Sequence, residues 1–299
     1  MTLDDPTPAT APRPGRTRSG RFEFPPGRVI DLPGRGRTFA RIVDAPPGAP
    51  TLLLLHGWTV TADLNWFTSY GALGRRFGLV ALDHRGHGRG IRSRGSFRLE
   101  DCADDAAALV EELGIERVIP VGYSMGGAVA QLLWRRHQRL VAGLVLCATA
   151  ASFNTTNRER LLFATAGSVA TATRLMPEQL RHRLGLRLLT GEAGGAVRRW
   201  ARGEMAHHDW LQLVSAARRI GSFDSRRWIP TVNVGVSVVV TTADAVVGTS
   251  RQRALAAAIP GCATFDVDGP HNACVTRASE FVPALEQAID TVTDRLNPA

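Results

Sequence analysis

The sequence predicts an α/β protein in which a mostly parallel, doubly wound sheet is interrupted by an inserted helical segment. Short apolar runs alternate with stretches of helical spacing along most of the 299 residues, a pattern typical of a parallel sheet covered by helices. The alternation stops between residues 151 and 229, where no convincing strand is found and much of the chain has helical spacing. An apolar fraction of 44% is ample for such a core.

The first half of the chain supplies the beginning of the sheet. Residues 1–25 are rich in proline and poor in large apolar side chains, so we expect a disordered tail there. The core should then occupy residues 26–150 and 230–299, on either side of the inserted segment. Its first elements are expected to be an antiparallel edge near 28–32 and 38–43, then strands at 51–55 and 79–83 that flank a helix around 63–75.

Turn and cap residues delimit the elements that follow. A helix is expected from Asp101 to Leu113, with the aspartate as its N-cap and Gly114 as its stop. The later elements are a strand before residue 124 and a helix after it, strands at 144–147 and 236–240, a helix at 250–259 and a strand at 263–267. Pro120 would lie in the central strand without the N–H that a ladder needs, so we expect a bulge or a change of register beside it.

The segment Gly122-Tyr123-Ser124-Met125-Gly126 is a G-x-S-x-G motif between a short apolar run and a helix-forming run. This layout is typical of a sharp strand-to-helix turn that holds a serine hydroxyl clear of the sheet. Glycines are needed because a side chain at 122 or 126 would collide with the neighbouring strand or helix. The simpler interpretation of Ser124 as an ordinary helix N-cap is disfavoured by these glycines and by the preceding strand.

Two later residues could activate this serine. A serine hydroxyl becomes a nucleophile when a histidine takes its proton and a carboxylate orients the histidine, and on such a fold the acid and the histidine follow the serine in that order. Asp244 comes just after the strand at 236–240, and His271 lies in the loop after the strand at 263–267. Both therefore lie outside the carboxyl ends of strands, where ligand-facing loops gather in open α/β sheets.

Each partner also has an alternative interpretation. Asp244 could be only a turn residue that ends a strand, and His271 a solvated loop histidine. Asp266 and Asp268 compete with Asp244 as the carboxylate, but they lie on or beside the histidine's own strand and are poorly placed to reach its ring.

Four segments carry a family resemblance: Leu54-Leu55-His56-Gly57-Trp58, Asp83-His84-Arg85-Gly86-His87-Gly88, the G-x-S-x-G segment, and the loops of Asp244 and His271. Together they resemble the α/β-hydrolase superfamily, and more narrowly its Ser-nucleophile esterases, lipases and cofactor-free perhydrolases with a helical cap. The resemblance spans about residues 28–294 and implies that residues 151–229 form the cap.

The resemblance implies a reaction. Ser124 would be the nucleophile, His271 the general base and acid, and Asp244 the orienting carboxylate. The chain would be a serine hydrolase that cleaves an apolar carboxylic ester through an acyl-enzyme intermediate, without a cofactor or a metal. Thioesters, lactones, C–C bonds and perhydrolysis stay open because the same triad serves them all. A protein that keeps the triad and only binds a small molecule is the other alternative.

The resemblance also implies where the substrate binds. The oxyanion hole would be formed by the backbone N–H groups of Trp58 and Met125. Trp58, Trp66 and Phe67 lie near the oxyanion loop in the sequence, and we expect their side chains to contact the substrate.

Charge alone would suggest a polyanionic partner, because the net charge is +9 and the isoelectric point is near 10.8. All 36 basic residues are arginines, however, and they are spread along a chain rich in alanine and glycine, which indicates compositional bias. No run has the length of a membrane span, and no apolar leader is seen. We therefore expect a small-molecule ester as the partner, with no nucleic acid and no membrane span; the oligomeric state is open.

The remaining polar residues add no second site. The cysteines show neither metal-binding spacing nor a disulfide framework, which suits a reducing compartment, and we expect a cytoplasmic location. Among the other histidines, His56 and His87 are expected to hydrogen-bond within their own turns, and His84, His207 and His208 have no assignable role.

Overall fold

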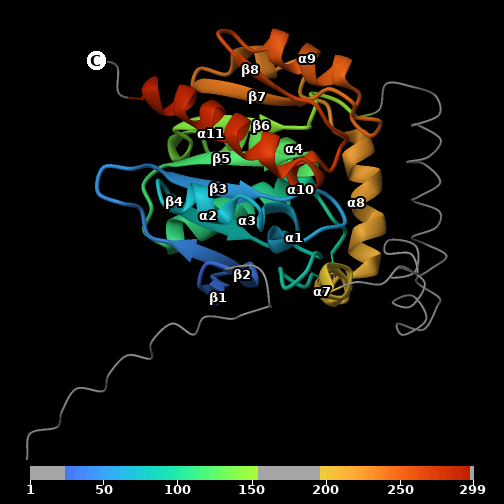
Figure 1. Cartoon of the computed structure of the whole chain (residues 1–299). Helices are drawn as coiled ribbons and strands as arrows, with labels where there is room; N and C mark the ends of the chain where they lie inside the picture. The colour runs from blue at the N-terminus through green and yellow to red at the C-terminus, as the bar shows by residue number, and fades with distance from the viewer. Residues whose placement is uncertain (1–23, 94, 154–195, 297–299) are drawn as a thin grey trace, which may run out of the picture.

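A mixed sheet forms the centre of the computed structural model, which describes residues 24–93, 95–153 and 196–296 (Figure 1). Its strands are β1 (Gly27–Leu32), β2 (Gly36–Val43), β3 (Thr51–Leu55), β4 (Gly78–Leu82), β5 (Val118–Tyr123), β6 (Gly143–Cys147), β7 (Gly235–Thr241) and β8 (Ala263–Val267). They lie in the order β1-β2-β4-β3-β5-β6-β7-β8, with β3 to β8 parallel and β1 and β2 antiparallel at one edge. The predicted α/β class and antiparallel edge are confirmed.

Helices cover both faces of this sheet. The α-helices of the described residues are α1 (Ala62–Trp66), α2 (Tyr70–Leu73), α3 (Leu99–Glu112), α4 (Met125–Arg136), α7 (Ala196–Met205), α8 (Trp210–Ser222), α9 (Thr249–Ala258), α10 (Ala273–Thr276) and α11 (Ala278–Asp294), of which α7 and α8 lie in the segment between β6 and β7. Leu53 and Leu55 of β3 pack in the apolar cluster that contains α3 and α4, whereas Leu52 and Leu54 pack with α1 and α11. Since both faces are buried, the strand is apolar at every position from 52 to 55.

Two helices differ from the sequence prediction. α3 begins at Leu99 and not after an Asp101 N-cap, because Leu99 is buried in the core and extends the helix by two residues. Asp101 instead lies in the first turn, where a negative charge interacts favourably with the helix dipole. The helix predicted between β3 and β4 is divided into α1 and α2, and Thr68 between them donates its hydroxyl to the carbonyl oxygen of Cys274 at 2.6 Å.

Pro120 lies inside β5, and the sheet changes register beside it. The ladder with β3 is continuous through Pro120. Toward β6, Val118 bridges to Val141, but the ladder resumes with Val121 opposite Val145, a shift of one residue. The expected change of register is therefore present on the β6 side, where a missing N–H is tolerated.

The described part of the segment between β6 and β7 contains α7 and α8. Of the expected cap, residues 151–229, the stretch 154–195 lies outside the described residues. Figure 1 shows α8 crossing the ends of the parallel strands. The indole N–H of Trp58, just after β3, donates to the carbonyl oxygen of Leu213 in α8 at 2.9 Å. α8 therefore lies near the carboxyl end of β3.

The expected tail, residues 1–25, also lies almost wholly outside the described residues. Its last residues are described, and Phe24 packs against Tyr70 at 6.4 Å and Trp200 at 5.5 Å between ring centroids. None of the helices in the described ranges is long and apolar enough to cross a membrane.

A buried carboxylate, Asp63, joins the edge of the sheet to the loops above it. The Arg41 guanidinium donates to both of its oxygens at 2.7 Å, and Arg89 donates at 2.9 Å. Burial would raise the pKa of Asp63, but the hydrogen bonds and charge of these arginines lower it below its usual value. Since Arg41 lies on β2, Asp63 on α1 and Arg89 after β4, one side chain ties three segments together.

Replacing Asp63 by alanine is expected to lower the free energy of unfolding by about 3–5 kcal/mol, because the Arg41 guanidinium would stay buried without its partner. Urea denaturation followed by circular dichroism measures the change. Asp31→Ala is the matched control, since Asp31 also pairs with an arginine, Arg37, but is 81% exposed, and little change is expected there. Equal losses in the two variants would contradict this account.

Candidate active site

Ser124 lies at the sharp turn between β5 and α4. Its φ of 54° and ψ of −115° are rare for a residue with a side chain, and such strain persists only where the surroundings fix it. Glycines make the turn possible: a Cβ at Gly126 would lie 2.1 Å from the carbonyl oxygen of Leu55, and one at Gly122 would lie 2.3 Å from that of Gly126. As expected from the sequence, the turn leaves no room for a side chain at either glycine.

His271 contacts this serine from the loop after β8. Its Nε2 lies 3.0 Å from Ser124 Oγ, and its Nδ1 lies 2.8 Å from Oδ2 of Asp244. A carboxylate only accepts hydrogen bonds, so Nδ1 carries the hydrogen and Nε2 is free to accept from the serine. Tyr123, next to the serine, donates its hydroxyl to the carbonyl oxygen of His271 at 2.6 Å and fixes the loop.

Asp244 is held in place on both of its oxygens. Oδ1 accepts the backbone N–H groups of Val246 and Val247 at 2.8 and 2.9 Å. Oδ2 accepts from His271, from the Thr241 hydroxyl at 2.7 Å and from the Gln252 amide at 3.1 Å. Burial would raise the pKa of Asp244, but these hydrogen bonds, with that from His271 the largest, lower it below its usual value. The carboxylate is therefore ionised and aimed at the ring.

The competing carboxylates lie elsewhere. Asp266 pairs with Arg253 at 2.7 Å on the surface, and Asp268 accepts from the Thr242 hydroxyl at 3.2 Å. Of the three aspartates considered from the sequence, Asp244 is the one that hydrogen-bonds to His271. In the ranges that the structure describes, no group of three or more His, Cys, Asp or Glu side chains is arranged to hold a metal ion.

The two expected oxyanion donors flank the serine. Met125 is the first residue of α4, and a Cβ placed on Gly57, the neighbour of Trp58, would lie 3.5 Å from Ser124 Cβ. Among the hydrogen bonds of the described residues, neither the Trp58 nor the Met125 backbone N–H is taken by a protein acceptor. Both N–H groups therefore remain candidates for the oxyanion hole.

The aromatic residues expected to contact the substrate differ in exposure. Trp58 is 37% exposed, and Phe67 is half-buried with its ring edge-on to Trp200 at 5.3 Å. Trp66 is fully buried, and its ring packs edge-on against Tyr123 at 6.1 Å in the core. Trp58 and Phe67 therefore stay candidates for substrate contact, whereas Trp66 supports the turn that carries Ser124.

Four other histidines, His56, His84, His87 and His208, form a buried cluster. His56 Nδ1 lies 2.7 Å from the carbonyl oxygen of Gly57, and His87 Nδ1 lies 3.1 Å from that of Arg85, as their own turns predict. His208, which has no role by sequence, contacts Gly88 and Thr59 across the molecule. No local pattern could have found these contacts, because they span 120 and 149 residues.

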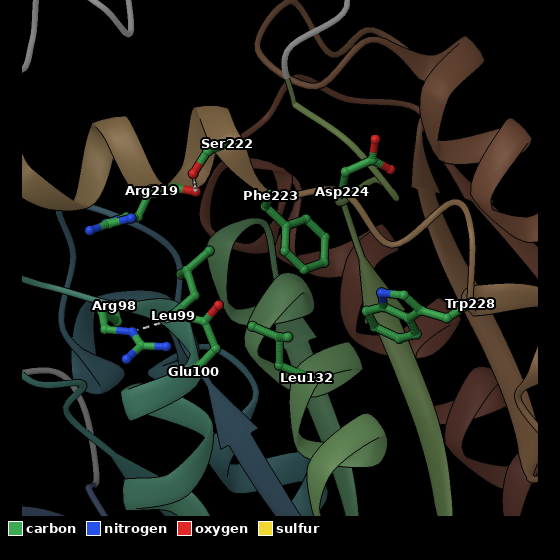
Figure 2. A pocket seen from close by; sticks show the side chains of 9 residues that line it. All are labelled: Arg98, Leu99, Glu100, Leu132, Arg219, Ser222, Phe223, Asp224 and Trp228. Carbon is green, nitrogen blue, oxygen red and sulfur yellow. Dashed lines mark hydrogen bonds and ion pairs between the residues drawn. The ribbon is translucent and has the colours of Figure 1, made fainter.

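A separate pocket of about 450 Å³ lies between the start of α3, the middle of α4 and the end of α8 (Figure 2). It is lined by Arg98, Leu99, Glu100, Leu132, Arg219, Ser222, Phe223, Asp224 and Trp228. Its lining contains an Arg98–Glu100 ion pair at 3.6 Å. Ser222 is its one serine, and no histidine is among the lining residues. Ser124, His271 and Asp244 are not among its lining residues.

Comparison with known proteins agrees with this geometry. The family model for the alpha/beta hydrolase fold matches residues 50–166. A bifunctional esterase/perhydrolase from Acinetobacter calcoaceticus is 38% identical over 103 residues, which is 34% of this chain. The match spans only 37% of that relative's length.

Solved structures match over most of the chain. The enol-lactonase from Burkholderia xenovorans has a TM-score of 0.70 at 24% identity and covers 89% of this chain and 100% of its own. A thermophilic esterase from Thermogutta terrifontis has a TM-score of 0.71 at 24% identity, with 89% and 98% covered. At such identities the likeness shows the fold.

The sheet order, the serine at the turn after β5 and the loops after β7 and β8 define an α/β-hydrolase fold. The chain therefore has the α/β-hydrolase fold, and its match to the family model covers residues 50–166.

Proposed function

We propose that the protein is a serine hydrolase that cleaves carboxylic esters with an apolar acyl or alcohol group through an acyl-enzyme intermediate. The proposal depends above all on one observation, the hydrogen-bonded series from Ser124 Oγ through both nitrogens of His271 to Asp244. The likeness to an esterase/perhydrolase supports the ester class. Exposed apolar side chains on the loops after β3 and β7, and on α10 just beyond His271, support an apolar substrate; they are Trp58, Val246 and Val275.

Acylation of the serine would come first. His271 Nε2 takes the hydroxyl proton as Ser124 Oγ attacks the ester carbonyl carbon, and the ionised Asp244 stabilises the imidazolium that forms. The carbonyl oxygen becomes an oxyanion that accepts from the N–H groups of Trp58 and Met125, and each such donor is worth about 3–4 kcal/mol in the transition state. His271 then gives its proton to the leaving alcohol, and the acyl group remains on Ser124.

Hydrolysis of the acyl-enzyme repeats these steps with water. His271 takes a proton from the water that attacks the acyl carbon, and the same two N–H groups bind the second oxyanion. The collapse of this intermediate breaks the bond to Ser124 Oγ, which regains a proton from His271, and the carboxylic acid leaves.

Hydrolysis of a p-nitrophenyl ester series from acetate to palmitate tests the proposal. The protein is expected to release p-nitrophenol with an optimum at one chain length, set by the size of the acyl pocket. Labelling of Ser124 by an alkyl fluorophosphonate, read by mass spectrometry, tests the nucleophile independently of the ester. Without ester turnover and without labelling, the protein would instead be a small-molecule binder on the same fold, and the hydrolase proposal would be abandoned.

Other chemistry is available to the same three side chains. Lactones, thioesters, C–C bonds and peracid formation are alternatives, and a lactone and a thioester added to the series separate two of them from simple esters. The proposed cytoplasmic location is supported by the cysteines, all of which are free thiols, as expected in a reducing compartment.

A further inference from the structure

The loop that carries the proposed Trp58 donor is held at two points by the segment inserted between β6 and β7. The Trp58 indole N–H donates to the carbonyl oxygen of Leu213 at 2.9 Å. The next residue, Thr59, has a φ of 66°, which is unfavourable for a β-branched side chain. Its carbonyl oxygen lies 3.1 Å from Nε2 of His208. The strained backbone beside the donor is therefore fixed from outside its own loop.

The His208 ring can make its contacts in one protonation state. Nδ1 accepts the backbone N–H of Gly88 at 2.8 Å, so the ring hydrogen must be on Nε2, which donates to Thr59. A second proton on Nδ1 would face the Gly88 N–H and break that contact. Burial lowers the pKa of His208 to about 3, in agreement with a neutral ring. The imidazole thus links the loop after β3 to the loop after β4.

The chain around His208 is itself firmly attached to the loop after β4. The Asp209 N–H donates to the carbonyl oxygen of Gly86 at 2.9 Å, and the Gln212 amide donates to those of Ser93 and Gly95 at 2.9 and 2.8 Å. α8 approaches so closely that a Cβ on Gly86 would lie 2.4 Å from Gln212 Cβ. His208 therefore has a rigid base from which to fix Thr59.

We propose that His208 is a positioning residue that holds the Trp58–Thr59 backbone so that the Trp58 N–H points at the oxyanion. This inference rests on the proposed function, since it assigns His208 a part in the same reaction. Loss of one oxyanion donor costs about 10²- to 10³-fold in kcat. A donor that is present but misdirected should lower kcat by about 10- to 100-fold. KM should change little, because the donor binds the ground-state carbonyl oxygen more weakly than the oxyanion of the transition state.

A pair of amide variants separates positioning from simple packing. In His208→Asn, the side-chain oxygen can accept from Gly88 in place of Nδ1, but the side chain is too short to reach Thr59. In His208→Gln, the longer amide can place its N–H where Nε2 lies and donate to Thr59. We expect His208→Asn to lose about 10- to 100-fold in kcat and His208→Gln to retain most of it, at similar melting temperatures.

The readouts are kcat and KM on the best p-nitrophenyl ester, the inhibition constant of an alkyl trifluoromethyl ketone, and the melting temperature. The ketone forms a hemiketal oxyanion with the serine, so its inhibition constant should rise in His208→Asn by a factor similar to the loss in kcat. Equal activity in both variants and the wild type, or equal losses that follow the melting temperature, would overturn the positioning role and leave the hydrolase proposal intact. An unreactive wild type would instead refute the proposed function.

Discussion

Ser124→Ala is expected to reduce kcat for ester hydrolysis by about 10⁶-fold, and His271→Ala by a similar factor. The double variant should be little slower than either single variant. The reason is the contact of 3.0 Å between Nε2 and Oγ: a hydroxyl without its base is not a nucleophile, and a base without the hydroxyl has no proton to take. The activity that remains in each variant would come from binding and the oxyanion donors alone.

Single-turnover measurements with a p-nitrophenyl ester check this prediction, and circular dichroism confirms that the variants are folded. His137→Ala is the matched control, because His137 also pairs with a carboxylate, Asp104 at 2.8 Å, but lies at the far end of α4. It should retain wild-type kcat. Losses that multiply in the double variant would show that Ser124 and His271 act independently, contrary to the proposed mechanism.

The sheet and the grouping of Ser124, Asp244 and His271 could be predicted from sequence for a common physical reason. Strands buried on both faces are apolar at nearly every position, so runs such as 236–240, in which Ser237 is the one polar residue, are visible without alignment. β8 is found at Ala263–Val267, the range that its turn residues predict. Once the strands are placed, the three side chains are expected at the same edge of the sheet, because the carboxyl ends of parallel strands lie together there.

Features set by tertiary contacts could not be predicted in this way. The start of α3 depends on Leu99, which is buried by the rest of the fold, whereas Asp101 has the stronger local N-cap signal. Trp66 is close in sequence to the oxyanion loop, but α1 turns its ring into the core. The sequence around His208 likewise gives no signal of its contacts, because its partners lie in two distant loops.

Asp244→Asn is expected to lower kcat by about 10⁴-fold while the fold is retained. The backbone N–H groups of Val246 and Val247 both donate to Oδ1, so the amide oxygen of asparagine would take that position. The amide N–H₂ would then replace Oδ2 and face Nδ1 of His271, which lies 2.8 Å away. A donor at this place favours the tautomer with hydrogen on Nε2, and that nitrogen could no longer accept the proton of Ser124.

Steady-state kinetics of Asp244→Asn beside Asp268→Asn check which carboxylate orients the ring. Asp268 lies in the same loop as His271 but bonds to the Thr242 hydroxyl, so its amide variant should keep wild-type kcat. A large loss in Asp268→Asn together with an active Asp244→Asn would mean that Asp268, and not Asp244, orients the ring. Because fluorophosphonate labelling of Ser124 needs the same neutral tautomer of His271, its rate should fall in Asp244→Asn by a comparable factor, whichever ester the protein prefers.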